Sequence, residues 1–224
     1  MYSNQLKSIA LVGATGLVGG RLLELLLADP TVQSVVVPGR RPLEIEHPKI
    51  RFHLSDLSPA HFPAEWLKGV EVVYCCLGTT IKKAGSRDKF RSVDYEMPLL
   101  LARRAAEAGV KKMVVVSSVG ANPLSTNFYL KVKGEMERDI QSSTSFQKLA
   151  FVRPSVLLGP RPEFRWVEQI GKFVLYLLSP LLRGGFARYR PIHDFTVAKA
   201  MVAISHSVSK QHIYESHELS WLGK

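Results

Sequence analysis

The sequence predicts an α/β fold in which a doubly wound, mostly parallel sheet carries a small C-terminal substrate cap. Three observations support this prediction. An apolar run ends in a glycine-rich turn that opens into a leucine-rich helical segment, over residues 9–27. Further short apolar runs alternate with helical segments along the chain, which is the order of elements in a parallel sheet. One of these runs, residues 71–77, is apolar almost throughout, as expected for a strand buried on both faces.

The glycine-rich turn has the spacing GxxGxxG at Gly13, Gly16 and Gly19. The first glycine permits a turn that a Cβ would block, the second removes bulk where a phosphate would lie, and the third allows the helix to pack close to the strand. A helix N-terminus also offers N–H groups and a partial positive charge to an anion. With a strand before it and a helix after it, the turn predicts dinucleotide binding, and a plain glycine turn is the alternative.

Composition narrows the class of protein. The chain has 224 residues, of which 46% are hydrophobic and 22% charged, which is typical of an ordinary globular protein. We therefore treat residues 1–224 as one domain, with residues 162–224 contributing the cap. The net charge is +11, but the basic residues occur in short pairs such as Arg40-Arg41. This scatter favours a solvated surface with a phosphate pocket over a nucleic-acid-binding tail.

The cysteines and the apolar stretches indicate a compartment. Cys75 and Cys76 are adjacent and are the two cysteines of the chain, so no disulfide framework is expected and a reducing compartment is indicated. In a strand they would point to opposite faces. Residues 1–7 do not resemble a signal peptide, and no apolar run approaches the ~20 residues that span a bilayer. No group of residues has metal-ligand spacing, so we expect a cytoplasmic protein without a metal site or an integral membrane segment.

The second strand, residues 34–37, ends in Pro38-Gly39-Arg40-Arg41. In a Rossmann fold an acid at this place binds the 2′-hydroxyl of NAD. Here Arg40 and Arg41 supply two guanidiniums that could hold a 2′-phosphate instead. This pattern favours NADP over NAD, and a basic surface turn is the alternative.

The next elements predict the middle of the site. Residues 50–54 alternate as a strand does, and Asp56-Leu57 follows at the place where such folds contact the adenine, although a plain turn explains it nearly as well. The strand 71–77 ends in Gly78-Thr79-Thr80, which fits the approach of a ligand. The basic segment 81–91 is expected to be a solvated loop, with a mobile flap over phosphates as the alternative. A helix is expected over residues 94–108, closed by Gly109.

A catalytic set follows the fifth strand, residues 112–116. The strand ends in Ser117-Ser118, and after a loop over residues 119–127 a helix contains Tyr129 and Lys133. Residues four apart share a helix face. A free phenol has a pKa of about 10, and a nearby ammonium favours the phenolate. Ser118 can hold a substrate oxygen for proton transfer, so we expect Ser118, Tyr129 and Lys133 to be catalytic.

The last third of the chain contains a sixth strand, residues 148–152, followed by Pro154, which suits a wall beside a flat ring. An amphipathic helix over residues 164–178 is expected to be core, with a substrate lid or a membrane-surface patch as alternatives. A loop with His193, expected to be structural, leads to a helix over residues 196–206 and a short strand near residue 213.

These motifs resemble the short-chain dehydrogenase/reductase superfamily in its extended or atypical branch. The matching segments are residues 13–19, 153–161 and the set Ser118, Tyr129 and Lys133. The chain is more similar still to the Tat-interacting oxidoreductase family, on residues 39–41, 75–80, 83–85 and 129–134. The glycine motif occurs in very many proteins, whereas the segment Cys-Cys-Leu-Gly-Thr-Thr at residues 75–80 is found in far fewer.

The resemblance implies an NADPH-binding Rossmann fold that reduces a carbonyl on a small or apolar substrate. The residues implied or expected at the cofactor are Gly13, Thr15, Gly16, Leu17, Val18, Gly19, Arg40, Arg41, Leu57, Leu77, Gly78, Thr79, Tyr129, Lys133, Pro154, Leu157 and Arg165. A binding protein that signals NADPH occupancy to a protein partner is the competing class, and an epimerase or dehydratase is a third. The region after the sixth strand is short for a large nucleotide-sugar substrate. The oligomeric state is left open.

Overall fold

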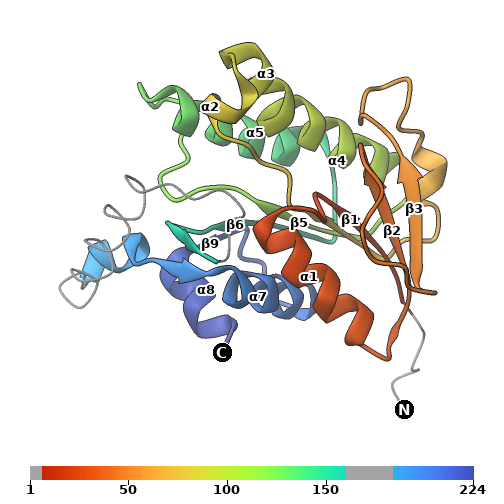
Figure 1. The fold of residues 1–224 in the computed structure, drawn as a ribbon. Helices are drawn as coiled ribbons and strands as arrows, with labels where there is room; N and C mark the ends of the chain where they lie inside the picture. The colour runs from red at the N-terminus through yellow and green to blue at the C-terminus, as the bar shows by residue number, and fades with distance from the viewer. Residues whose placement is uncertain (1–6, 160–183) are drawn as a thin grey trace.

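The structure is a computed structural model that describes residues 7–159 and 184–224. In these residues, seven strands form one sheet in the order β3-β2-β1-β4-β5-β6-β9, and every neighbouring pair is parallel. In Figure 1, α3, α4 and α5 cover one face of this sheet and α1 and α7 cover the other. The predicted doubly wound, Rossmann-like α/β fold is confirmed.

The strands of this sheet are β1 (Lys7–Val12), β2 (Val32–Gly39), β3 (Ile50–Leu54), β4 (Val72–Cys75), β5 (Lys112–Val116), β6 (Lys148–Arg153) and β9 (Ile213–Glu215). A separate short parallel pair is formed by β7 (Leu157–Leu158) and β8 (Ile192–His193). The α-helices are α1 (Leu17–Ala28), α2 (Ile81–Ala84), α3 (Arg87–Arg91), α4 (Met97–Glu107), α5 (Phe128–Ser143), α7 (Asp194–His206) and α8 (Ser216–Leu222). Single helical turns of other types occur at Ala64–Leu67, Ser92–Glu96 and Gly184–Tyr189.

The strand order places a switch point beside β1. The chain winds outward from β1 through β2 to β3, and then returns to β4 on the other side of β1 and continues to β9. At such a point the connections after β1 and β4 leave toward opposite faces of the sheet, which opens a crevice at the carboxyl ends of these strands.

The sheet is buried on both faces, in two hydrophobic clusters. Alternate residues of β1 contribute to different clusters, with Ile9 and Leu11 on the α1 side and Ala10 and Val12 on the other. The two cysteines likewise divide between the clusters, as predicted for neighbours in a strand. Continuous apolar strands in the sequence therefore correspond to strands packed on both sides.

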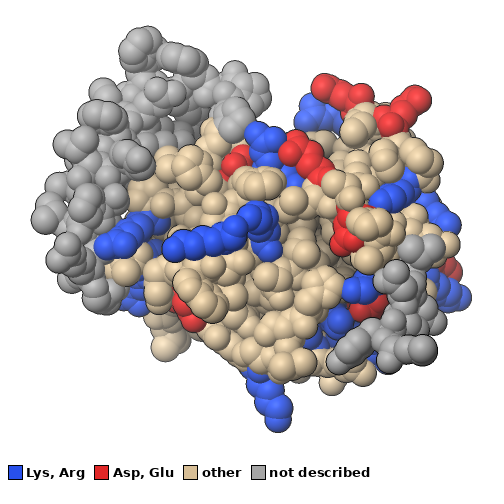
Figure 2. Space-filling model, turned by 90° about the horizontal axis from the view of Figure 1, so that it is seen from below, with Lys and Arg blue, Asp and Glu red and all other residues tan. Residues whose placement is uncertain are grey.

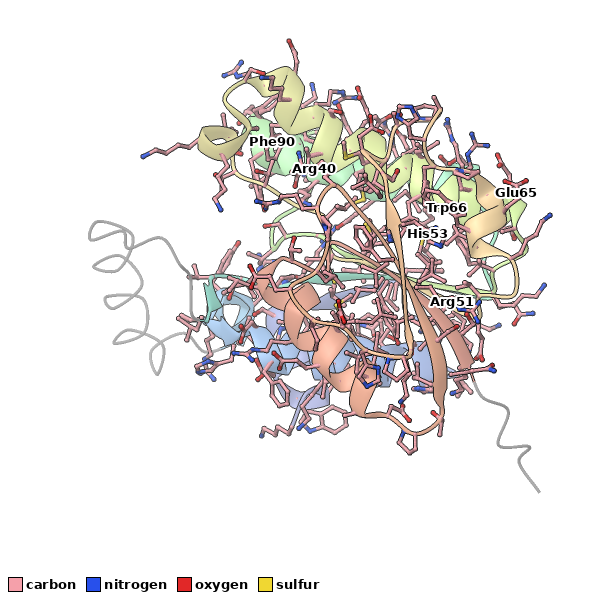
Figure 3. All side chains as sticks on the ribbon, turned by 45° about the vertical axis from the view of Figure 1, so that its right-hand side comes forward. Arg40, Arg51, His53, Glu65, Trp66 and Phe90 are labelled. Atoms are coloured by element: carbon pink, nitrogen blue, oxygen red, sulfur yellow. The ribbon has the colours of Figure 1, made fainter. Side chains whose placement is uncertain are left out.

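The expectation of a solvated loop over residues 81–91 is wrong. This segment forms α2 and α3, whose N-caps Thr80 and Ser86 accept hydrogen bonds from the backbone N–H groups of Lys83 and Lys89. Phe90 is fully buried, and its ring lies between α3 and α5 (Figure 3). The centroid of this ring is 5.8 Å from the ring centroid of Phe128 and 5.5 Å from that of Tyr129. A single buried aromatic residue therefore fixes a segment whose other residues are mostly exposed and half of them basic.

The helix expected over residues 94–108 also begins differently. Helical structure starts at Arg87, passes through a π-helical turn at Ser92–Glu96 and continues as α4. Asp94, which we expected at the start of a helix, lies inside the π turn and is fully buried. The helix is followed by Gly109 with φ +77°, as predicted.

The C-terminal residues take part in the main sheet. The expected helix and strand are present as α7 and β9, and α8 was not expected. In Figure 1, α7 lies beside α1 under the sheet, and its buried residues share one hydrophobic cluster with those of α1. We expected residues 162–224 to form a cap, but α7 and β9 belong to the layers of the Rossmann fold. The predicted helix 164–178 and Arg165 lie outside the described residues.

Two of the three motif glycines are required by packing. Gly13 has φ +90°, and a Cβ there would lie 2.6 Å from the backbone carbonyl of Cys76. A Cβ on Gly19 would lie 2.1 Å from the Gly13 carbonyl oxygen. The glycines therefore bring β1, α1 and the end of β4 into direct backbone contact.

Gly19 and Gly20 offer a matched pair of variants. We expect Gly19→Ala to destabilise the fold by about 3 kcal/mol, because its Cβ meets immovable backbone. Gly20→Ala should stabilise it by about 0.5–1 kcal/mol through helix propensity, since its Cβ would meet nothing closer than 3.6 Å. Urea unfolding monitored by circular dichroism measures both, and equal stabilities would contradict this account of the turn.

Candidate functional site

A cleft of about 710 Å³ lies at the carboxyl ends of β1, β4, β5 and β6. Its walls are the segments that follow these strands, together with one face of α5. It brings together many of the residues predicted from the sequence: Thr15, Gly16, Leu17, Val18, Leu77, Gly78, Thr79, Ser118, Tyr129, Lys133, Pro154 and Leu157. A smaller hollow of about 410 Å³ beside α8 shares no lining residue with it, so the cleft is the candidate site.

Other predicted residues lie outside the cleft lining. Gly13 and Gly19 shape the turn beneath it. Leu57 is buried in the core on the α4 side and has φ +61°, a left-handed conformation that costs a residue with a Cβ roughly 1–2 kcal/mol. Arg165 falls outside the described residues.

Arg40 and Arg41 directly follow β2 and are exposed to solvent. Within residues 7–159 and 184–224, neither guanidinium has an ion-pair partner. Their positive charge is therefore available to an anionic ligand.

The first-turn N–H groups of α1 have no side-chain acceptor among the described residues. The N-cap of α1 is Gly16, which supplies no side chain to the first-turn N–H groups, and no acidic residue lies in that turn. These N–H groups and the positive end of the helix dipole therefore face the cleft without an internal acceptor.

A buried ion pair lies on the other side of the cleft. The Nζ atom of Lys133 is 2.8 Å from Oδ1 of Asp94, and the two side chains are 3% and 1% exposed. The second carboxylate oxygen, Oδ2, accepts a hydrogen bond of 2.9 Å from the backbone N–H of Thr79. A Cβ on Gly78 would lie 3.5 Å from Oδ1 of Asp94, so glycine leaves room above the pair.

The charge state of Lys133 follows from this pair. Burial alone would lower the pKa of the ammonium, but the Asp94 carboxylate outweighs it, and the pKa of Lys133 is raised above its ordinary value. Lys133 is therefore a cation at neutral pH. The sequence analysis missed Asp94, because an acid at the start of an expected helix is an ordinary first-turn residue.

The π turn that holds Asp94 is fastened to α5 by one residue before Asp94 and one after it. Arg91 donates a hydrogen bond of 2.5 Å to Glu135, and the Tyr95 hydroxyl donates one of 2.8 Å to Asp139. Since π turns replace one regular helical turn with a wider one, the turn and these two contacts direct Asp94 inward onto Lys133.

Tyr129 and the two serines complete this part of the cleft. Tyr129 lies one helical turn before Lys133 on α5, and both line the cleft. Ser118 Oγ has a weak contact of 3.4 Å with the Val119 carbonyl. Ser117 also lines the cleft, and its buried Oγ has no hydrogen-bond partner in the described residues. Ser117 was named in the sequence analysis only as the neighbour of Ser118, and its unpaired hydroxyl makes it an equal candidate.

The mouth of the cleft beside α1 contains a second set of charges that sequence reasoning missed. Arg21 Nε lies 3.6 Å from Oδ2 of the largely buried Asp194, and its guanidinium also pairs with Glu24 at 3.0 Å. A Cβ on Gly159 would lie 2.5 Å from Asp194 Oδ2. The start of α7 is thus held against both α1 and the end of β7.

The remaining surface gives two further findings. Among the described residues, no helix is long and apolar enough to cross a bilayer, and no group of acidic, His and Cys side chains could hold a metal. In Figure 2, Lys and Arg side chains are dispersed over the face seen from below, and do not form one continuous patch.

The comparisons with known proteins agree with this architecture. A family model described as HIM1 matches residues 44–172, more than half of the chain. The chain belongs to the HIM1 family. It is 32% identical over 228 residues to protein HTATIP2 of Rattus norvegicus, covering 100% of this chain and 92% of that protein. The resemblance to the Tat-interacting family stated from the sequence is therefore confirmed.

Fungal relatives and solved structures extend this HIM1 family comparison. Protein FMP52, mitochondrial, of Debaryomyces hansenii is 36% identical over 157 residues, covering 69% of this chain and 68% of its own. Among solved structures, MoeE5 in complex with UDP-glucose and NAD superimposes with a TM-score of 0.68 at 18% identity, over 92% of this chain and 74% of that one. At this identity the likeness shows the fold alone, which is the Rossmann-like α/β fold described above.

Removal of the Lys133 charge tests the buried pair. We expect Lys133→Met to destabilise the fold by about 3–5 kcal/mol at pH 7, because Asp94 is left buried without its partner. Since the pKa of Lys133 is raised above 10.5 in the folded state, its contribution is complete below that pH and is lost as the pH rises through the raised value. The difference between wild type and variant should therefore shrink in strong alkali.

Denaturant unfolding at several pH values measures this effect. Arg138→Met is the control, since Arg138 lies on the same helix with a 57% exposed side chain paired to Asp139, and we expect stability close to that of wild type. Equal effects of the two substitutions would show that the Asp94–Lys133 pair carries no special weight.

Proposed function

We propose that the protein is an NADPH-dependent oxidoreductase of the atypical short-chain dehydrogenase/reductase type, which reduces a carbonyl on a small or apolar substrate. The observation that carries this proposal is the cleft itself. It joins a glycine turn at the start of α1 to the Tyr129–Lys133 face of α5 across the switch point of the sheet. A dinucleotide bound at a switch point lies across these same elements.

The residues present fit such a cofactor. The glycine turn leaves backbone N–H groups open to a pyrophosphate near Thr15, Gly16, Leu17 and Val18. The unpaired Arg40 and Arg41 would hold a 2′-phosphate, and the backbone near Leu57 would contact the adenine. Leu77, Gly78 and Thr79 would contact the middle of the cofactor, with Pro154 and Leu157 beside the nicotinamide. When bound, NADPH would supply the hydride.

The protein would supply the proton and the orientation. The Tyr129 hydroxyl donates its proton to the carbonyl oxygen of the substrate. The Lys133 ammonium stabilises the phenolate that remains, and it can also donate to a ribose hydroxyl. Ser118 or the unpaired Ser117 donates a hydrogen bond that holds the substrate oxygen. Low accessibility to water at Lys133 strengthens each of these interactions.

One observation favours the second candidate function, an NADPH-binding regulator. Phe90 of the basic α2–α3 segment packs directly against Tyr129. Occupancy of the cleft could therefore change the outer surface of α2 and α3, which a protein partner would read. The presence of an intact Ser, Tyr and Lys set in one cleft supports the enzyme over this alternative.

The setting of the protein is also a proposal. We propose that residues 1–224 act as one NAD(P)-binding unit, to which the part of residues 162–224 outside the Rossmann layers adds a substrate cap. Two free cysteines, the buried Cys75 and the half-buried Cys76, support a reducing compartment. Our expectation of a purely cytoplasmic protein has no support from the fungal relatives, since FMP52 proteins are named mitochondrial.

The reductase proposal is tested with NADPH and a panel of aldehydes and ketones. We expect nicotinamide absorbance to fall with at least one compound, and Tyr129→Phe to lower kcat by about 10²–10⁴-fold, the usual contribution of a general acid. Tyr214→Phe is the matched control, because its hydroxyl accepts a hydrogen bond from Lys148 and it does not line the cleft. Tight NADPH binding without turnover on any compound would support the regulator instead.

Coenzyme selectivity is tested by calorimetric titration. We expect Arg40→Ala and Arg41→Ala each to weaken NADPH binding by about 10–100-fold, the value of a charge-assisted hydrogen bond of about 1.5–3 kcal/mol, and to leave NADH binding unchanged. Arg51→Ala is the control, since Arg51 is an exposed arginine on β3 that lies apart from Arg40 in Figure 3. Equal weakening for both coenzymes would mean that these guanidiniums do not contact the 2′-phosphate.

A further inference from the structure

Asp94 differs from the other carboxylates of the cleft. Glu24 is exposed, and Asp194 lies at the first turn of α7. Asp94 is fully buried inside a π turn, and each of its oxygens has a different partner. Oδ1 contacts the Lys133 ammonium, and Oδ2 accepts from the Thr79 backbone N–H. One side chain thus joins the turn after β4 to the helix that carries Tyr129.

The charge on Lys133 depends on this carboxylate. Three ionisable groups act on the ammonium: Asp94 from the π turn, Tyr129 from its own helix and Cys75 from β4. Burial raises the pKa of the Cys75 thiol to about 11, so the thiol is neutral at physiological pH. Asp94 is therefore the fixed negative charge that keeps a buried lysine protonated.

The geometry around Asp94 leaves the ammonium little freedom. The Arg91–Glu135 and Tyr95–Asp139 contacts hold the π turn against α5 from both sides, and the Thr79 N–H fixes the second oxygen. The ion pair is therefore complete before any ligand enters the cleft, so no charge has to be reorganised when one binds.

We infer that Asp94 is a positioning residue of the site, which holds the Lys133 ammonium in place beside Tyr129 and couples it to the Gly78–Thr79 turn. The role in turnover rests on the proposed function, whereas the effect on Lys133 does not. A merely structural residue would alter stability without changing the protonation of Lys133.

The first experiment needs neither cofactor nor turnover. Lysine ¹³Cε signals are followed by NMR as a function of pH in the full chain, and the Lys133 signal is assigned by its absence in Lys133→Met. In wild type we expect the Lys133 signal to titrate above pH 10.5, the ordinary lysine value. A wild-type midpoint at or below that value would overturn the inference, and this measurement needs no altered carboxylate.

The variant Asp94→Asn keeps the size of the side chain and an oxygen that can accept from Thr79. Here burial is no longer opposed by a carboxylate, so we expect the Lys133 midpoint to fall below pH 10.5. Glu96→Gln removes an exposed carboxylate from the same π turn and should leave the midpoint as in wild type. An unchanged midpoint in Asp94→Asn, or an equal fall in both variants, would overturn the inference.

The second experiment measures turnover as a function of pH. In Asp94→Asn, kcat/KM for NADPH-dependent reduction should fall up to tenfold per pH unit above the Lys133 midpoint measured by NMR, and should recover toward the wild-type value below it. Wild type and Glu96→Gln should show no such break in that range. Profiles that run parallel in all three proteins would overturn the role of Asp94 in turnover. Absence of turnover in wild type would instead remove the proposed function and leave the NMR result standing.

Discussion

The cost of burying a lysine governs the architecture of this cleft. A lone ammonium at 3% exposure would lose its proton or open the fold. Asp94 supplies the opposite charge from the π turn that precedes α4. Arg91 and Tyr95 hold this turn against α5 through Glu135 and Asp139. The contacts between the π turn and α5 thus support one buried ion pair.

The fold is predictable from the sequence because its signals are local. Each central strand is a short apolar run, and strand and helix alternate, so a parallel, doubly wound sheet is the consistent solution. The glycine turn could be assigned because Gly13 and Gly19 stand at a strand-to-helix junction where backbone meets backbone. The packing of Cys75 and Cys76 on opposite faces of the sheet could be predicted because neighbouring residues of an extended chain alternate.

The rest of the site could not be predicted because its signals are non-local. Asp94 meets Lys133 only in the folded chain, and its own sequence context is that of a helix start. The segment 81–91 was predicted to be a loop because helices of four and five residues are too short to show a helical period of apolar residues. A single apolar residue, Phe90, does not indicate a buried helix face. The sequence Ser117-Ser118 does not indicate which hydroxyl is unpaired. Only the structure shows that the buried Ser117 hydroxyl has no partner among the described residues, whereas the Ser118 hydroxyl contacts the Val119 carbonyl.

The hydrogen bond from the Thr79 backbone N–H to Asp94 makes the two walls of the cleft differ in the backbone N–H groups that they offer to an anion. The amide after β4 is already bonded to a carboxylate whose charge is balanced by the Lys133 ammonium, so it is not free to bind a phosphate. The amides at the start of α1 have no such partner among the described residues. The phosphates of an elongated ligand would therefore be bound by the amides of α1 rather than by the amide of Thr79. This polarity sets the direction in which an elongated molecule can lie in the crevice.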